Sequence, residues 1–221
     1  MAQHVRHTLT EKRRRFSAER SIGQYLASHA VRKLQIGAGT NHLPGWLNTD
    51  IEPDKDEVYL DASGPYPIPS ESIDYIFAEQ LIEHLGFEQG LEMLKEWRRI
   101  LRGHGTIRIA TPNLLTLVGL FRDESAEAKR YAQQDIAFNN LSLLPTAPSA
   151  VLNMQMHRFG HQFLYDPETL SRALTSVGFR SIRTTPVGRS DDPALDGIDS
   201  HGKVVGEELN RYVTMVYEAS K

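Results

Sequence analysis

Cysteine is absent from this 221-residue chain, which excludes disulfides and thiolate metal sites and fits a reducing compartment. Long apolar runs are missing too, because no segment approaches the roughly 18 consecutive apolar residues that a membrane-spanning helix needs. No apolar signal-peptide core follows the first basic residues. We therefore expect a soluble, cytoplasmic protein that has no membrane partner.

An excess of positive charge is also lacking. Lys and Arg number 25 against 28 Asp and Glu, for a net charge of −3. This balance gives no overall attraction to nucleic acid, so we do not expect a nucleic-acid partner. The one basic cluster, Lys12–Arg15, lies in an N-terminal segment (residues 1–31) for which we expect a short helix from Phe16 to Ala30. We interpret the cluster as a solvated helix face, with an RNA-contacting arm as the alternative.

Short β-rich runs make up much of the remaining chain, residues 32–221. The strands that we expect are residues 31–36, 46–51, 58–61, 73–78, 106–110, 180–185 and 212–219. A helix over residues 87–101 separates the fourth strand from the fifth and implies a parallel pair. Another helix begins at Asp166–Pro167 and ends at Gly178. With no helix expected between them, the last two strands should be antiparallel.

Residues 114–156 break this strand–helix rhythm. We expect helices over residues 114–121 and 125–138 and a loop afterwards, because Pro145 and Pro148 interrupt the pattern. An insertion that follows the carboxyl end of a strand would lie over the ligand crevice of an open parallel sheet.

The first strand runs directly into Gly37-Ala38-Gly39. Two glycines allow a tight turn beneath a ligand, although this motif alone is weak. Asn41 stands where a dinucleotide-binding fingerprint has its third glycine, and no helical pattern follows. The loop is therefore poorly suited to a pyrophosphate, and a nucleoside cofactor without phosphates fits better.

Carboxylates end the next two expected strands. Asp50 is placed to accept both hydroxyls of a ribose, and Asp61 to receive an adenine amino group, whereas a surface Asp is the alternative for each. Only ten residues, 40–49, separate Gly39 from Asp50, and parallel crossovers usually need about a dozen or more. The helices of the first two crossovers must therefore be cut to turns.

Candidate acid–base residues follow the fourth strand. Glu79 is placed to face the cofactor, and Glu83 and His84 lie one turn further on. His157 and His161 are four residues apart, but Arg158-Phe159-Gly160 between them is a poor helix without a carboxylate, so we expect no metal site. Glu83, His84, His157 and His161 are candidates for a general base, with capping or hydrogen bonding as the alternative.

In their order, these motifs resemble the class I S-adenosylmethionine-dependent methyltransferases, especially small proteins related to methyltransferase type 11. The segments that carry the resemblance are residues 34–39, 44–51, 61 with 66–69, 72–74, 83–85, 101–105, 111–113 and 161–165. The resemblance implies an α/β, Rossmann-like, mostly parallel seven-stranded sheet with an antiparallel last strand, helices on both faces and two abbreviated first crossovers.

The resemblance also implies roles for single residues. Gly37, Ala38 and Gly39 would approach the methionine part of S-adenosylmethionine, and Glu79 would lie near its amino-acid end. Asp50 would hold the ribose, Ile51 would pack on adenine, and Asp61 with Ala62 would flank the adenine edge. The sequence departs from the family at Gln35, which replaces an acid that supports the ammonium group of the cofactor.

Methyl transfer from a sulfonium depends on alignment of the acceptor and exclusion of water, and a base is needed only if the acceptor is a hydroxyl. By the resemblance we expect a small-molecule or saccharide acceptor, with polysaccharide biosynthesis as the preferred context. Glu83, His84 and His161 are the predicted catalytic residues. The alternatives are a catalytically silent cofactor-binding subunit and a nicotinamide-dependent dehydrogenase. The apolar run Leu114–Phe121 could serve as a homodimer contact.

Overall fold

A computed structural model describes residues 2–140 and 147–221, with side chains from residue 14 onward. The strands are β1 (Lys33–Ile36), β2 (Leu47–Asp50), β3 (Val58–Tyr59), β4 (Ile73–Glu79), β5 (Leu101–Pro112), β6 (Arg180–Thr185) and β7 (Thr214–Ser220). The helices are α1 (Ala2–Ser28), α2 (Phe87–Ile100), α3 (Leu114–Gly119), α4 (Ala126–Phe138), α5 (Pro148–His157), α6 (Pro167–Val177), α7 (Gly202–Val205) and α8 (Glu207–Val213), with a 3-10 turn at Ile82–His84.

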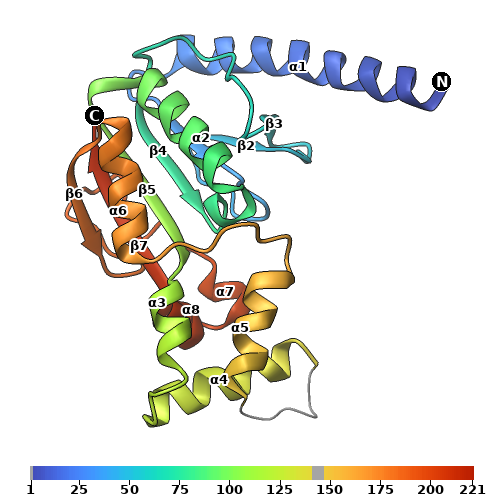
Figure 1. The fold of residues 1–221 in the computed structure, drawn as a ribbon. Helices are drawn as coiled ribbons and strands as arrows, with labels where there is room; N and C mark the ends of the chain where they lie inside the picture. Colours follow the sequence, from blue (N-terminus) through green and yellow to red (C-terminus); the bar gives the residue numbers. More distant parts are fainter. Residues whose placement is uncertain (1, 141–146) are drawn as a thin grey trace.

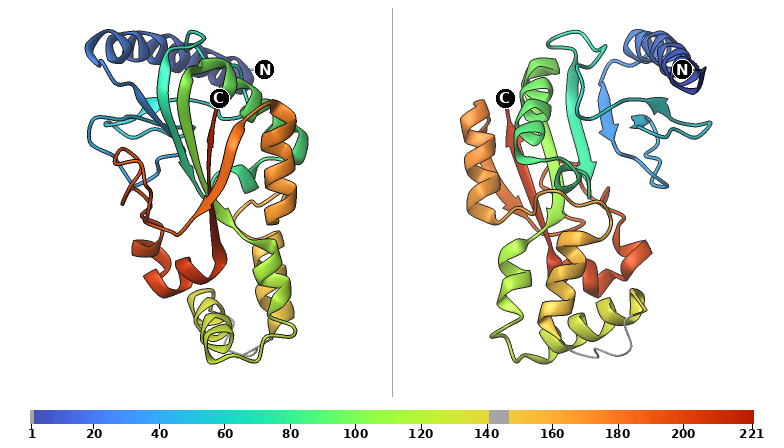
Figure 2. Two further views of the ribbon diagram at one scale, coloured as in Figure 1. Left: turned by 90° about the vertical axis from the view of Figure 1, so that its left-hand side faces the viewer. Right: turned by 45° about the vertical axis from the view of Figure 1, so that its right-hand side comes forward.

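All seven strands form one sheet in the order β3-β2-β1-β4-β5-β7-β6 (Figures 1 and 2). The first five strands pair with one another in parallel, and β7 is antiparallel to both β5 and β6. The predicted α/β fold with its antiparallel last strand is therefore confirmed. The order reverses at β1 and β4, which is where an open α/β sheet presents its ligand crevice.

The first two crossovers are abbreviated, as predicted. Residues 37–46 and 51–57 contain no helix, and β3 is only two residues long. The amide of Asn48 holds the first turn in place, because its Oδ1 accepts from Leu43 N at 3.0 Å and its Nδ2 donates to Leu43 O at 3.2 Å. Gly45 completes the turn with a φ of 76°.

The two faces of the sheet are covered differently. Ile76 and Ala78 of β4 join the core that α2, α6 and residues of α1 complete. Phe77, which points to the other face, packs with Trp46 and with Leu195. Leu195 belongs to the β6–β7 connection (residues 186–213), which lies over this second face (Figure 2, left). Burial on both faces explains why β4 is apolar along most of its length.

Several expected boundaries were wrong. The N-terminal helix is not short but runs from Ala2 to Ser28. The region expected to be a loop after residue 138 contains α5, because Pro148 occupies the first helical turn, where a missing N–H costs nothing. The β6–β7 connection contains α7 and α8, so β7 begins at Thr214 instead of residue 212.

Strand β5 begins five residues earlier than expected, at Leu101. It passes through Gly105, at which a Cβ atom would lie 2.5 Å from Leu101 Cγ and 2.9 Å from Asp74 O. This glycine allows close strand packing at a register irregularity between β4 and β5.

Helices α3, α4 and α5 form the insertion, which lies below the carboxyl ends of β4 and β5 (Figure 1). Together with α8 they enclose a second apolar core. Its most buried members are Leu117, Ala128, Ile136, Val151 and Met154. Among the described residues, no helix has the length and apolar character needed to cross a membrane.

Candidate functional site

The loop after β1 makes the tight turn that its glycines allow. Gly37 and Gly39 have φ values of 68° and 52°, in the left-handed region that other residues rarely adopt. A Cβ atom on Gly37 would lie 2.9 Å from Leu81 Cδ1, so the loop passes close to the segment after β4. Ala38 N donates to Thr49 O at 3.0 Å and fixes the loop against β2.

Asp50 lies beside this loop. Its Oδ2 accepts from Gly39 N at 3.2 Å, and its Oδ1 accepts from Glu52 N at 2.9 Å. The carboxylate is half-buried and each oxygen keeps a second lone pair, so it can still accept hydroxyl groups. Ile51, which follows, is 55% exposed and offers an uncovered apolar surface. The structure thus brings together the glycines and the strand-end Asp that the sequence suggested.

Asp61 organises its own turn, because its Oδ1 accepts from both N and Oγ of Ser63 at 2.9 and 2.7 Å. Ala62 is buried, and its carbonyl accepts from Tyr66 Oη at 3.0 Å. Asp61 lines a hollow of about 310 Å³ that it shares with residues of α1, including Arg15. Gly37, Gly39 and Asp50 do not line this hollow.

Glu79 ends β4 next to the glycine loop, because the parallel register pairs Gln35 of β1 with Phe77 two residues earlier. Its carboxylate is already engaged: Oε2 accepts from Ser200 N at 2.8 Å and Oε1 from His201 N at 3.0 Å. Burial raises the pKa of Glu79, and these backbone hydrogen bonds oppose the rise. Glu79 therefore fixes the β6–β7 connection over the strand ends.

A buried ion network anchors the same connection. The guanidinium of Arg108 (β5) is fully buried and bonds to Asp199 and, at 2.6 Å, to Oε1 of Glu218. Its Nη1 also donates to Thr185 Oγ1 at 2.9 Å. Asp199 directly precedes the two residues that bind Glu79. Arg108 thus holds the connection at one point and Glu79 holds it at the next.

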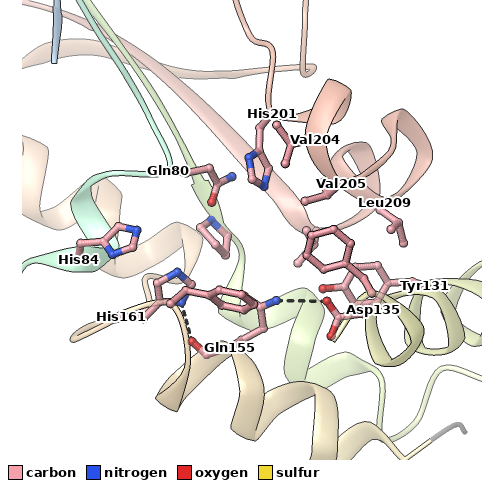
Figure 3. A pocket seen from close by; sticks show the side chains of 14 residues that line it. Gln80, His84, Tyr131, Asp135, Gln155, His161, His201, Val204, Val205 and Leu209 are labelled. Carbon is pink, nitrogen blue, oxygen red and sulfur yellow. Dashed lines mark hydrogen bonds between the residues drawn. The ribbon is translucent and has the colours of Figure 1, made fainter. Parts of the chain in front are cut away.

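A cavity of about 250 Å³ opens beyond the carboxyl ends of β4 and β5; we call it the strand-end cavity (Figure 3). Insertion helices and the β6–β7 connection enclose it. Its lining residues are Gln80, His84, Pro112, Tyr131, Asp135, Phe138, Gln155, Phe159, His161, His201, Val204, Val205, Leu209 and Val213. Gln80 directly follows β4 and has a φ of 52°, a strained conformation of the kind that clusters at functional sites.

The three predicted catalytic residues lie together at one end of this cavity. Glu83, His84 and His161 bring donor atoms within 4.8 Å of one another, although they are up to 78 residues apart in sequence. The two imidazole rings meet edge to face at 4.9 Å, and both line the cavity. Glu83 is completely buried, with Oε2 accepting from Thr111 Oγ1 at 2.9 Å and Oε1 without a hydrogen-bond partner in the part of the chain that the structure describes.

Burial sets the protonation of this cluster. It raises the pKa of Glu83 to about 7, against the opposing hydrogen bond from Thr111. It lowers the pKa of His84, which the neighbouring His161 lowers further, and it also lowers the pKa of His161. His161 Nδ1 lies 2.6 Å from Gln155 O, so Nδ1 carries the proton and Nε2 is free to accept one. The histidines are therefore neutral near pH 7 and suited to act as bases.

His157 is the fourth candidate base and lies apart from this cluster. It is exposed at the last residue of α5, and the loop expected after it is present, with Phe159 and Gly160 at positive φ. A second group of close donors is His42, Asp54 and Glu57, at the crossovers of β2. His42 Nε2 is within hydrogen-bond distance of Gly39 O at 3.2 Å, and it lies 3.4 Å from Glu57 Oε1, at ion-pair distance. The absence of a metal site stays a prediction.

Sequence reasoning missed the opposite end of the cavity, which Tyr131 and Asp135 of α4 form (Figure 3). Their spacing of one helical turn was visible in the sequence, but their burial was not, because it depends on packing against α5 and α8. His201 was also missed, since only the path of the β6–β7 connection brings it to the site.

Comparison with known proteins gave structural likenesses only. No family model matches the chain, and no curated protein matches it. A SAM-dependent methyltransferase from Archaeoglobus fulgidus is similar over 97% of this chain and 99% of its own, with 19% identity and a TM-score of 0.49. One from Thermotoga maritima covers 100% of both chains, with 15% identity and a TM-score of 0.49. One from Mesorhizobium loti covers 86% of this chain and 91% of its own, with 15% identity and a TM-score of 0.48.

Proposed function

We propose that this protein is an S-adenosylmethionine-dependent methyltransferase. The observation that carries the proposal is the joining of Gly39 N–H to the Asp50 carboxylate at adjacent strand ends, beside a cavity that could hold an acceptor. This is the ribose-binding arrangement that the motif resemblance implies. The cofactor would supply a methyl group on a positively charged sulfur.

The residues that would hold the cofactor follow from the loop geometry. Gly37, Ala38 and Gly39 give a backbone that a ligand can approach closely, Asp50 has free lone pairs for two hydroxyls, and the exposed Ile51 offers an apolar surface.

Three further residues would complete the binding region. Asp61 and Ala62 would flank the adenine edge. Glu79 would act at the amino-acid end through the connection that it fixes, because its carboxylate already binds Ser200 and His201. Gln35, in place of the family's acid, is buried, its Oε1 has no hydrogen-bond partner among residues 14–140 and 147–221, and it is a second polar group in that region.

Residues of the strand-end cavity would handle the acceptor. His161 Nε2 would accept the proton of an acceptor hydroxyl. The ring of His84 lies next to that of His161, and the buried Glu83 completes the cluster. The insertion and the β6–β7 connection would exclude water, which strengthens every polar contact inside. No metal takes part in this proposal.

The acceptor that we propose is a small molecule. Seven of the fourteen lining residues are apolar or proline, without counting the ring of Tyr131. Such a lining suits a compact, partly apolar molecule better than a saccharide chain. A saccharide acceptor, and with it polysaccharide biosynthesis, stays a weaker prediction. Cytoplasmic location and the division into a helical segment (residues 1–31) and a methyltransferase domain (residues 32–221) belong to the same proposal.

Self-association through α3 also belongs to the proposal. Leu115, Val118 and Phe121 are 63, 49 and 54% exposed. Large apolar side chains exposed together are typical of a contact surface, and a homodimer would cover them. Light scattering on the full chain should then give twice the monomer mass, and a monomer at high concentration would contradict this part.

Calorimetric titration with S-adenosylmethionine, S-adenosylhomocysteine and NAD tests the proposal. We expect the first two to bind and NAD not to bind. Tight NAD binding without a response to the other two would overturn the proposal in favour of a dehydrogenase. Cofactor binding without methyl transfer to any of a broad set of acceptors would instead indicate a silent subunit.

A further inference from the structure

The end of the strand-end cavity away from His84 and His161 holds two buried side chains, each with a polar oxygen that lacks a hydrogen-bond partner among the described residues. Tyr131 and Asp135 are 4 and 8% exposed, and they lie one turn apart on α4. Neither Tyr131 Oη nor Asp135 Oδ2 has a hydrogen-bond partner among the described residues. The other carboxylate oxygen, Oδ1, has only a long contact with Gln155 Nε2 at 3.5 Å.

Such an arrangement is costly in a folded protein. A buried polar group without a hydrogen bond destabilises the fold by about 1–3 kcal/mol, and a buried charge by more. Burial raises the pKa of Asp135 to about 6, so the group is still mainly a carboxylate at neutral pH. An unpaired buried carboxylate that lines a cavity is expected where a ligand supplies the missing partner.

The neighbouring cations of the protein are engaged elsewhere. Arg130 pairs with Glu208 at 2.9 Å, and Arg158 donates to Asn139 O at 3.2 Å. No described Lys, Arg or His forms a salt bridge with Asp135. Asp135 therefore has no cationic partner among the described residues, and its negative charge lies at this end of the cavity.

The side chains that line the strand-end cavity indicate what kind of molecule would carry the positive charge that complements Asp135. The rings of Tyr131, Phe138 and Phe159 and the side chains of Val204 and Leu209 line the cavity. Aromatic faces favour cations, and apolar walls favour a hydrocarbon body. Inorganic cations or strongly hydrated polyols would find few further oxygen ligands here.

We propose that the acceptor is a small apolar amine whose ammonium group binds between Asp135 and Tyr131. This inference rests on the proposed methyltransferase function, and it adds the chemical class of the substrate. Asp135 lies away from the strand ends, and His84 and His161 occupy the other end (Figure 3). The ammonium is therefore an anchor, and a second nucleophilic group of the same molecule, such as a hydroxyl, would lie at the histidines.

Calorimetry on the full chain tests this with matched ligands. The probes are tyramine against 4-ethylphenol, which lacks only the amine, and cyclohexylamine against cyclohexanol. At least one amine should bind about 10-fold or more tightly than its neutral partner, because charge-assisted hydrogen bonds are the stronger class. Asp135→Asn should reduce amine affinity about 10- to 100-fold and leave the neutral ligands unchanged.

Two controls separate the site from general effects. Glu124→Gln removes the same charge from a side chain that is 91% exposed just before α4, and it should leave all affinities unchanged. S-adenosylhomocysteine binding and the melting temperature of Asp135→Asn report on folding, and neither should fall.

The outcomes distinguish the two proposals. Equal binding of amines and neutral partners, no binding of either amine, or amine binding that Asp135→Asn leaves intact would overturn the amine inference alone. Selective amine binding that depends on Asp135, in a protein that does not bind S-adenosylmethionine, would support the amine site and overturn the proposed function.

Discussion

In the half of the sheet formed by β1, β2 and β3, carboxylates lie in short loops and accept hydrogen bonds from nearby backbone N–H groups. Asp50 and Asp61 both do so, and both stay partly exposed. In the half formed by β4, β5 and β7, with the 3-10 turn and the helix α4 beyond their ends, Glu83 and Arg108 are completely buried, and Asp135 is nearly so. The first half can bind a ligand at little cost to stability. The second half holds ionisable groups whose charged forms are destabilised by burial.

This difference has a consequence for mutation. Changes to the carboxylates of the first half should alter ligand affinity and leave the free energy of unfolding nearly unchanged. Changes in the second half should alter stability, its pH dependence or the chemical step. Variants in the two halves test whether effects on ligand affinity and effects on stability separate in this way.

Replacement of Arg108 should give the largest loss of stability. Arg108→Met leaves Asp199 buried without its counter-charge and leaves Glu218 with Arg183 as its remaining partner, and breaking such a network costs about 3–5 kcal/mol. Urea unfolding measures the effect. Arg172→Met, at a side chain that is 79% exposed and paired with Glu168, should cost less than about 1 kcal/mol. Similar losses for the two variants would contradict the prediction.

Glu83→Gln should change the pH dependence of stability. The pKa of Glu83 is raised from 4.5 to about 7, so folding favours its protonated form, and its contribution to stability is lost as pH rises through this window. The difference in unfolding free energy between variant and wild type should shift by about 3 kcal/mol from pH 4 to pH 8, in favour of the variant at pH 8. Urea unfolding at both pH values measures this shift.

A matched variant isolates the hydrogen bond to Glu83. Thr111→Val removes the donor that stabilises the charged carboxylate. It should therefore destabilise the protein more at pH 8 than at pH 4, by about 1 kcal/mol. If the free energies of unfolding of Glu83→Gln and wild type differed by the same amount at pH 4 and pH 8, Glu83 would not be buried as described.

His161→Asn should lower the rate of methyl transfer to a hydroxyl acceptor about 100-fold without changing cofactor affinity. Asn can still donate to Gln155 O, but it offers no titrating nitrogen. Burial lowers the pKa of His161, so wild-type activity should fall only below about pH 6.5. Glu83 and His84 lie next to the imidazole ring of His161, so their own titration will also affect the fall of activity at low pH. An unchanged rate and pH profile in the variant would exclude His161 as the base.

The same division explains how much the sequence could predict. The short first crossovers and the meeting of the glycine loop with Asp50 follow from short-range rules: a strand, a tight turn and the next parallel strand. The helix from Pro167 was also predicted, because its start and end signals, Asp166 and Gly178, are local. In the structure Asp166 caps the helix by accepting from Thr169 N at 2.8 Å, and Gly178 ends it at a φ of 98°.

Long-range packing was beyond the sequence. Glu79 binds Ser200, 121 residues away, and no local pattern indicates this contact. Pro148 looked like an interruption because a proline breaks a helix interior but is favoured in its first turn. No local sequence pattern marks Asp135, since only tertiary packing buries it.

In the first half of the sheet, Asp50→Ala should weaken cofactor binding by about 1–3 kcal/mol, through loss of charge-assisted hydrogen bonds. Its free energy of unfolding should change by less than about 1 kcal/mol, because Asp50 is partly exposed. Asp56→Ala, at a 61% exposed side chain in the next crossover, should leave affinity unchanged. Calorimetry with S-adenosylhomocysteine measures both variants, and equal affinities for wild type and Asp50→Ala would refute the role of Asp50.

The smallest expected effects lie in the glycine loop, where two alanine variants separate backbone strain from packing. Gly37 and Gly39 both have positive φ, so Gly→Ala should cost about 1 kcal/mol of stability at each. At Gly39 nothing lies within 4 Å of a new Cβ, whereas at Gly37 Leu81 Cδ1 lies at 2.9 Å. Gly37→Ala should therefore cost more, and the excess should disappear in the double variant with Leu81→Ala, as measured by urea unfolding in a double-mutant cycle. Additive effects of Gly37→Ala and Leu81→Ala would mean that the glycine loop does not pack against Leu81 in the segment after β4.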